Sequence, residues 1–150
     1  GALYWSMHRY ADALPLYERV RATFERTLDP QHPNMAALYN NLAETYWKLG
    51  RNSEAEPLFR RALAIKEARL TPDNPSVAVT LNGLAGVLLA EGRTADAEVA
   101  YRRALGIRER ALGPTHDDVK ETSTALEALL RGRGRAREAD SLAAPCSSRR

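Results

Sequence analysis

The sequence predicts an all-α fold, an α-solenoid in which antiparallel helix pairs stack on one another. The first observation is an internal period of 42 residues, because Gly-Arg recurs at residues 50–51, 92–93 and 134–135. The second is that apolar residues within each period lie three or four positions apart, as on one face of an α-helix. A fixed period of this length with helical spacing is typical of proteins whose helix pairs bury their apolar faces by stacking.

Other residues recur in the same register. A small residue lies where two helices would approach closely, and an aromatic residue four positions later would fill the space beside it. The recurring sets are Ala13/Ala55/Ala97/Ala139, Tyr17/Phe59/Tyr101, Arg19/Arg61/Arg103, Glu25/Glu67/Glu109, Leu28/Leu70/Leu112, Pro30/Pro72/Pro114 and Leu42/Leu84/Leu126.

The first helix of each pair is expected to begin at a proline-containing loop and to end at the glycine of Gly-Arg. The loops contain His32-Pro33 and Asn74-Pro75, and proline suits a first helical turn because the N–H it lacks would have no helical partner there. Apolar residues follow at helical spacing, and Gly50 can adopt the left-handed conformation that ends a helix.

The second helix of each pair is expected to start directly after the tight Gly-Arg turn. Its apolar residues, from Ala55 to Ile65, keep the helical spacing. The helix is predicted to run to about Leu70, where the loop around Pro72 resets the pattern.

The ends of the chain depart from the repeat. We expect a partial first repeat over residues 1–29, complete repeats over 30–71 and 72–113, a shortened repeat over 114–144 and a disordered tail over 145–150. Tyr4 and Trp5 align with Tyr46 and Trp47, and Pro145 would stop the last helix early. The expected object is therefore a piece of a longer array, or a minimal array whose open N-terminal face is covered by something else.

A resemblance to a known family follows from one stretch of sequence. The run from Asn40 to Ala62, NNLAETYWKLGRNSEAEPLFRRA, followed by LAI and a proline loop, resembles the tetratricopeptide repeat in the 42-residue variety of kinesin light chains. The resemblance extends over residues 2–143. It implies a superhelical array that binds proteins, with the first helices lining a concave side on which family members hold peptides.

Residues that point away from the packing stripe of the first helices are the candidate peptide contacts. Asn40 and Asn82, one period apart, can each donate to and accept from a peptide main chain, whereas Trp47, like Trp5 before it, offers rigid aromatic area. The alternative is that the asparagines bond to a neighbouring helix and that Trp47 covers a seam between helices. The full candidate set is Asn40, Asn41, Glu44, Trp47, Lys48, Asn82, Gly83, Gly86, Leu89, Thr124 and Arg131.

Composition and charge exclude several classes of protein. A chain of 150 residues fits one domain or a short array rather than an enzyme with separate cofactor and substrate domains. Its pI of 9.2 comes from residues 131–150, which carry a net charge of +4, whereas the rest of the chain carries −1. The lone Cys146 excludes an intrachain disulfide and suits a cytoplasmic location. No apolar run approaches the ~18 residues of a membrane span.

No catalytic, cofactor or metal site is expected, so we do not expect an enzyme. His32 and His116 occupy one loop position two periods apart, where they would diverge rather than meet at a metal. His116-Asp117-Asp118 is expected to serve the N-terminus of a helix instead. A phosphate loop is also not indicated, because Gly132 and Gly134 lie among arginines without a Lys-Ser/Thr partner.

Three functional hypotheses follow. The leading one is a non-catalytic interaction module whose concave face binds a peptide segment of a partner protein. Because Glu44 and Glu121 lie among its basic residues, the preference of kinesin light chains for acidic peptides does not carry over. The alternative is a sensor or oligomerisation arm of a larger signalling protein, such as a bacterial one, with self-association through the open N-terminal face.

The third and remote hypothesis is a nucleic-acid contact through the arginine-rich residues 131–137, driven by phosphate charge. Two observations weigh against it. Arg135 belongs to the recurring Gly-Arg turn, and no Phe, Tyr or Trp that could stack on bases follows Tyr101.

Overall fold

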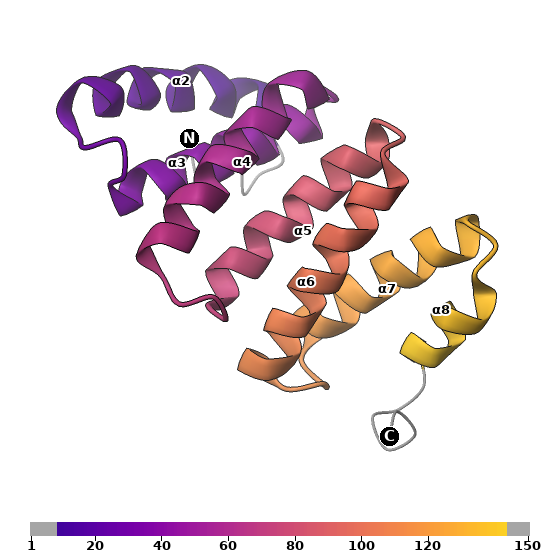
Figure 1. The fold of residues 1–150 in the computed structure, drawn as a ribbon. Helices are drawn as coiled ribbons and strands as arrows, with labels where there is room; N and C mark the ends of the chain where they lie inside the picture. Colours follow the sequence, from indigo (N-terminus) through magenta and orange to yellow (C-terminus); the bar gives the residue numbers. More distant parts are fainter. Residues whose placement is uncertain (1–8, 144–150) are drawn as a thin grey trace. The chain divides into compact units, whose positions relative to one another are not determined.

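A computed structural model describes residues 9–143, and within them the chain forms seven α-helices and no strand (Figure 1). The all-α fold expected from the 42-residue period is thereby confirmed. The chain divides into two compact units, residues 1–71 and 72–150, which we describe one at a time. Tyr4, Trp5, Cys146 and the expected tail over residues 145–150 lie outside the described residues.

The first unit contains α2 (Tyr10–Thr27), α3 (Pro33–Lys48) and α4 (Asn52–Arg69). α3 packs along α4 over most of its length and also contacts α2 (Figure 1). The second unit contains α5 (Pro75–Ala90), α6 (Thr94–Leu112), α7 (Asp117–Gly132) and α8 (Ala136–Ala143). Here α5 packs on α6, α6 on α7 and α7 on α8.

The first helices of the pairs start with the same side-chain cap. The side chains of His32, Asn74 and His116 each accept a hydrogen bond from the backbone N–H two residues later, at 3.1, 2.9 and 3.2 Å. Each cap satisfies one of the N–H groups that a helix N-terminus leaves without a helical partner. Residues 116–118 lie at a helix N-terminus as expected, but the cap is made by the histidine side chain, at His32 as well as at His116.

The Gly-Arg turns end these helices. Gly50, Gly92 and Gly134 have φ of 75°, 77° and 73°, the left-handed conformation that glycine adopts without steric cost. The N–H of the following arginine returns to a carbonyl five residues earlier in each case, at 2.9 Å, which completes a Schellman motif.

The arginine of each turn also forms an ion pair with an acidic residue three positions later. The pairs are Arg51–Glu54, Arg93–Asp96 and Arg135–Glu138, at 2.6 to 2.9 Å. Arg9, one period before Arg51, pairs in the same way with Asp12 at 2.7 Å. Gly-Arg therefore recurs for two physical reasons: the glycine closes one helix, and the arginine binds the first turn of the next.

The repeated small and aromatic residues form the core. Ala13, Ala55, Ala97 and Ala139 are 0% exposed, so neighbouring helices lie directly against them. Tyr17, Phe59 and Tyr101 are buried, which confirms that the aromatic residue fills the space beside the alanine.

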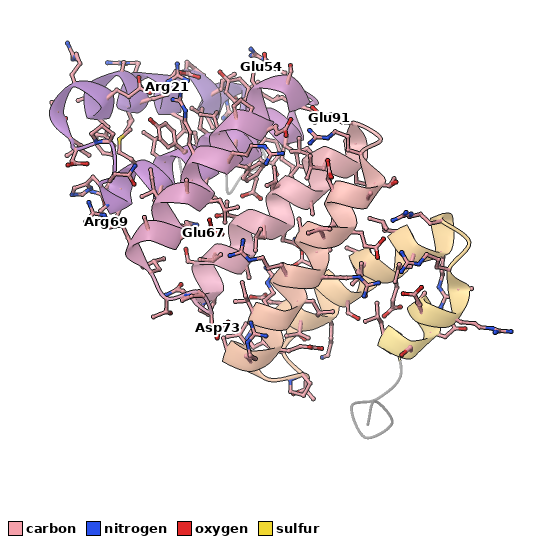
Figure 2. All side chains as sticks on the ribbon, in the orientation of Figure 1. Arg21, Glu54, Glu67, Arg69, Asp73 and Glu91 are labelled. Carbon is pink, nitrogen blue, oxygen red and sulfur yellow. The ribbon has the colours of Figure 1, made fainter. Side chains whose placement is uncertain are left out.

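Polar contacts within each unit join the helices and loops at the surface. In the first unit, Arg69 at the end of α4 donates to the carbonyl of Gln31 in the α2–α3 loop at 3.2 Å. In the second, the Arg110 guanidinium on α6 lies 2.5 Å from the Asp73 carboxylate. Arg69 and Asp73 are both labelled in Figure 2.

Candidate peptide-binding surface

The candidate residues of the first unit all lie on α3. Asn41 and Lys48 are exposed, and Glu44 and Trp47 are half-buried. The Lys48 ammonium lies 4.6 Å from the centre of the Trp47 ring, a cation–π arrangement. Asn40 differs from expectation, because it is only 7% exposed although its place on the helix indicated an open side chain.

The candidate residues of the second unit lie on α5 and α7. Asn82 and Gly83 are half-buried, Gly86 is buried against expectation, and Leu89 is 38% exposed. On α7, Thr124 and Arg131 are exposed. The Arg131 guanidinium lies 2.7 Å from the Asp140 carboxylate of α8.

Asn82 belongs to a polar cluster that joins three helices. Its Oδ1 atom lies 3.4 Å from the Thr122 hydroxyl of α7, and Nη1 of Arg108, from α6, donates to that same hydroxyl at 2.5 Å. Arg108 also donates to the Asp118 carbonyl at 2.8 Å and lies 3.5 Å from the Glu121 carboxylate. An asparagine bond to a neighbouring helix, the alternative considered from the sequence, is therefore present at Asn82.

The cluster orients the amide of Asn82. The Asp118 carbonyl, 3.0 Å from the Thr122 hydroxyl, also accepts from Arg108. It therefore stays hydrogen-bonded when Thr122 donates instead to Oδ1 of Asn82 at 3.4 Å. With Oδ1 engaged, Asn82 presents the two N–H donors of its amide away from the cluster. Half-buried donors held in this way can recognise the carbonyl oxygen of a bound main chain.

Sequence reasoning missed Arg108, which is 5% exposed and whose Nε is buried without a hydrogen-bond partner in the described structure. Local pattern could not separate it from the exposed arginines around it. One signal was available: Lys66 precedes Arg108 by one period, just as Thr80 precedes Thr122. A cation and a threonine that recur together on otherwise apolar faces indicate a repeated polar position.

The arginine-rich end is largely engaged in ion pairs within the second unit. Glu98 of α6, 8% exposed, accepts hydrogen bonds from Arg133 and, at 2.8 Å, from Arg135. Arg102 binds the same carboxylate at 2.9 Å. Burial alone would raise the pKa of Glu98, but hydrogen bonds from Arg102 and Arg135 outweigh it and hold the pKa below its usual value. Less positive charge remains for phosphate groups than the sequence indicated.

Other possible ligand-binding groups have local roles. The Asp117 carboxylate lies 3.0 Å from the Lys120 ammonium, whose hydrogen bond lowers the pKa of Asp117. Within residues 9–143 no three His, Cys, Asp or Glu side chains form a group suited to a metal ion. None of the described helices combines the length and apolar character needed to cross a membrane.

Comparison with known proteins identifies the repeat. The tetratricopeptide repeat family matches residues 1–68 and 76–144, and no curated protein matches the chain. Among solved structures, the chain is similar to a kinesin light chain from Podosopora anserina with nearly identical TPR-like repeats, and to a form of that protein with one substituted residue. Both have a TM-score of 0.85 and 26% identity over 94% of this chain.

A third solved structure, BtubC (BKLC) from P. vanneervenii, also has a TM-score of 0.85, at 24% identity over 94% of this chain. The chain spans 66%, 67% and 56% of the lengths of the chains in these three structures. Tetratricopeptide repeats are generally non-catalytic modules for protein–protein interaction. With two family matches that together cover most of its length, this chain belongs to the tetratricopeptide repeat family, and its solved relatives are of the kinesin-light-chain type.

Proposed function

We propose that this chain is a non-catalytic module that binds a peptide segment of a partner protein on its first helices. The observation that carries the proposal is the polar cluster around Asn82. Thr122, whose hydroxyl accepts from the buried Arg108, donates to the amide oxygen of Asn82, and this bond gives the N–H donors of Asn82 a preferred direction before any ligand arrives. Fixed donors reduce the entropy lost on binding.

The surface of α3 supports the same function. Asn41 and Lys48 are exposed, and the half-buried Trp47 offers an aromatic face with a cation beside it. Aromatic residues contribute strongly to protein interfaces. On the same helix Glu44 balances the charge of Lys48, which favours a partner segment of mixed or low charge.

The test uses a peptide selected from a random phage-displayed library against the wild-type chain. Its affinity is then measured by isothermal titration calorimetry for wild type, Asn82→Ala and Asn40→Ala. Loss of Asn82 leaves a buried carbonyl of the peptide without its donor, which costs about 1–3 kcal/mol, or roughly fivefold to 150-fold in affinity. The fold should persist, because the Thr122 hydroxyl retains the Asp118 carbonyl as a partner at 3.0 Å.

Asn34→Ala is the matched control, since Asn34 is exposed on the first turn of α3 and its affinity should equal that of wild type. Unchanged affinity for both Asn82→Ala and Asn40→Ala would remove the first helices from the site. A library that yields no binding peptide at all would contradict the proposed function itself.

A further inference from the structure

A pocket of about 240 Å³ lies in the first unit, where the α2–α3 loop meets α3 and α4. Two of its lining residues are buried, Tyr39 of α3 and Ile65 of α4, at 6% and 4% exposed. The exposed lining residues are Pro30, Gln31, Arg61 and Ala64. This pocket, which we call the Tyr39 pocket, thus combines an aromatic ring, aliphatic groups and a cation.

In the second unit, the equivalent place is filled by side chains of the chain itself. The Arg110 guanidinium of α6 pairs with the Asp73 carboxylate of the preceding loop at 2.5 Å. Arg110 also covers Gly106, because a Cβ at position 106 would lie 3.3 Å from its Nη1 atom. Gly106 follows Ala64 of the Tyr39 pocket by one period. A flat guanidinium therefore occupies in the second unit the place that is open in the first.

The first unit lacks both members of that ion pair. Gln31 lies one period before Asp73, and Ala68 lies one period before Arg110. The methyl group of Ala68 is too short to reach across α4 to the loop. Arg69 holds the loop instead, by donating to the Gln31 carbonyl at 3.2 Å, and Arg69 does not line the pocket. The loop is thus fixed while the pocket beside it stays open.

The cation of the Tyr39 pocket has no acidic partner. Arg61 is the one charged residue among the six that line the pocket. Its guanidinium lies 5.8 Å from the centre of the Tyr39 ring, and among residues 9–143 no carboxylate pairs with it. Glu25 bonds to the Tyr39 hydroxyl at 3.3 Å, but it also lies 3.8 Å from Arg21. An anion placed against Arg61 would therefore meet a positive charge that no ion pair has neutralised.

We propose that the Tyr39 pocket binds a small aromatic carboxylate. The ring of the ligand lies against Tyr39 and Ile65, since aromatic rings pack favourably edge-to-face or offset. Its carboxylate binds Arg61, whose guanidinium can donate two parallel N–H bonds to it. A volume of about 240 Å³ is smaller than that of most sites for drug-sized molecules, so a ligand of one or two rings fits.

A small molecule suits this pocket better than a segment of a protein. Protein interfaces surround their anchor residues with further apolar area, but none of the large apolar residues that are exposed in the described chain lines the pocket. The loop at its edge is polar, and Asp29 there accepts the N–H of Gln31 at 2.7 Å. Insertion of an aromatic side chain from a partner protein becomes an outcome that the experiment separates.

The probe is indole-3-acetate, titrated into the ¹⁵N-labelled chain and followed by NMR through the shifts of backbone amides. For a ligand of this size we expect a Kd on the order of 1 mM, with the largest shifts at residues 31, 39 and 61–65. The neutral indole-3-acetamide should bind the wild-type chain at least about fivefold more weakly, and so should the acid with Arg61→Gln. Arg19→Gln is the matched control, because it removes the same charge from an exposed position one period earlier and should leave the Kd unchanged.

A variant with a filled pocket gives the structural test. Gln31→Asp combined with Ala68→Arg rebuilds the pair found at Asp73 and Arg110, and it should abolish the shifts without lowering the helix content measured by circular dichroism. The comparison of acid and amide uses the wild-type chain and so does not depend on how any variant folds.

Equal affinity for the acid and the amide would overturn the assignment, as would shifts that gather outside the Tyr39 pocket or no shifts up to about 10 mM acid, roughly tenfold above the expected Kd. A last arm uses a blocked neutral peptide, acetyl-Gly-Trp-Gly-amide. If this peptide binds the pocket as tightly as the acid does, the pocket accepts an aromatic side chain of a protein, and the proposal of a small carboxylate is wrong.

Discussion

Removing the carboxylate of Glu98 should loosen α8 from α6 and lower the stability of the second unit. Glu98 is 8% exposed and binds Arg102, Arg133 and Arg135. A hydrogen bond to a charged group contributes about 1.5–3 kcal/mol. The side chains of the three arginines are 35–42% exposed, so water replaces part of what they lose. We therefore expect Glu98→Gln to cost about 2 kcal/mol in total.

The assay is urea unfolding followed by circular dichroism at pH 7, with amide hydrogen exchange of residues 136–143. In Glu98→Gln the free energy of unfolding should fall by about 2 kcal/mol, and exchange in α8 should become faster. Glu91→Gln is the control, because the Glu91 carboxylate lies 3.7 Å from the Arg93 guanidinium at the surface. An exposed pair of this kind contributes less than about 1 kcal/mol.

The pH dependence gives a second check on the same reasoning. Burial of Glu98 would raise its pKa, but the hydrogen bonds from Arg102 and Arg135 hold the pKa below the usual value. A carboxylate whose pKa is lower in the folded state than in the unfolded state stabilises the fold fully above its unfolded-state pKa, about 4.3 for Glu. This stabilisation is lost as the pH falls through the folded-state pKa. The difference between wild type and Glu98→Gln should therefore shrink below about pH 4. A difference under about 0.5 kcal/mol at pH 7, or one that persists in acid, would refute the argument.

Three further substitutions test the core, the titration of a buried lysine and the turns. Ala97 is 0% exposed, so Ala97→Trp should destabilise the fold, because overpacking typically costs about 1–3 kcal/mol or more. An unchanged melting temperature would contradict the helix packing. Burial lowers the pKa of Lys66 to about 8, so between about pH 8 and 10.4 the unfolded chain binds a proton at Lys66 that the folded chain has lost. The free energy of unfolding should therefore rise with pH over this range, by up to about 3 kcal/mol. Urea unfolding of Lys66→Met should not show this rise. A Cβ at position 92 would meet nothing within 4 Å, but Gly92 has a φ of +77°. Gly92→Ala should therefore lower the free energy of unfolding by about 1–2 kcal/mol through backbone conformation alone. A stabilised variant would argue against the turn.

Sequence alone predicted much of the fold, because the contacts that define each helix pair recur with the period. The glycines at 50, 92 and 134 adopt the expected left-handed conformation, and the second helix predicted to run to about Leu70 ends at Arg69. Local spacing is sufficient here, since each turn is closed by residues within five positions of one another.

The candidate site was less predictable, because its geometry depends on residues far apart in the sequence. Arg108 and Glu98 have the same residue types as many exposed neighbours, and their roles follow from partners 14 and 37 positions away, Thr122 and Arg135. Helical phase indicates the side of a helix on which a residue lies, but not how closely the neighbours cover that side. Asn40 and Gly86 were expected to be open and are buried for this reason.

The Gly-Arg turns have a consequence for how such a chain can change over evolutionary time. Each turn is completed by its own hydrogen bonds and by an arginine that binds the acid three residues later. A duplication or deletion whose breakpoints fall at two equivalent turns joins a complete helix end to a complete helix start, with every local contact preserved. The array can therefore lengthen or shorten by whole periods through recombination, while substitutions on the exposed faces alter what each copy binds.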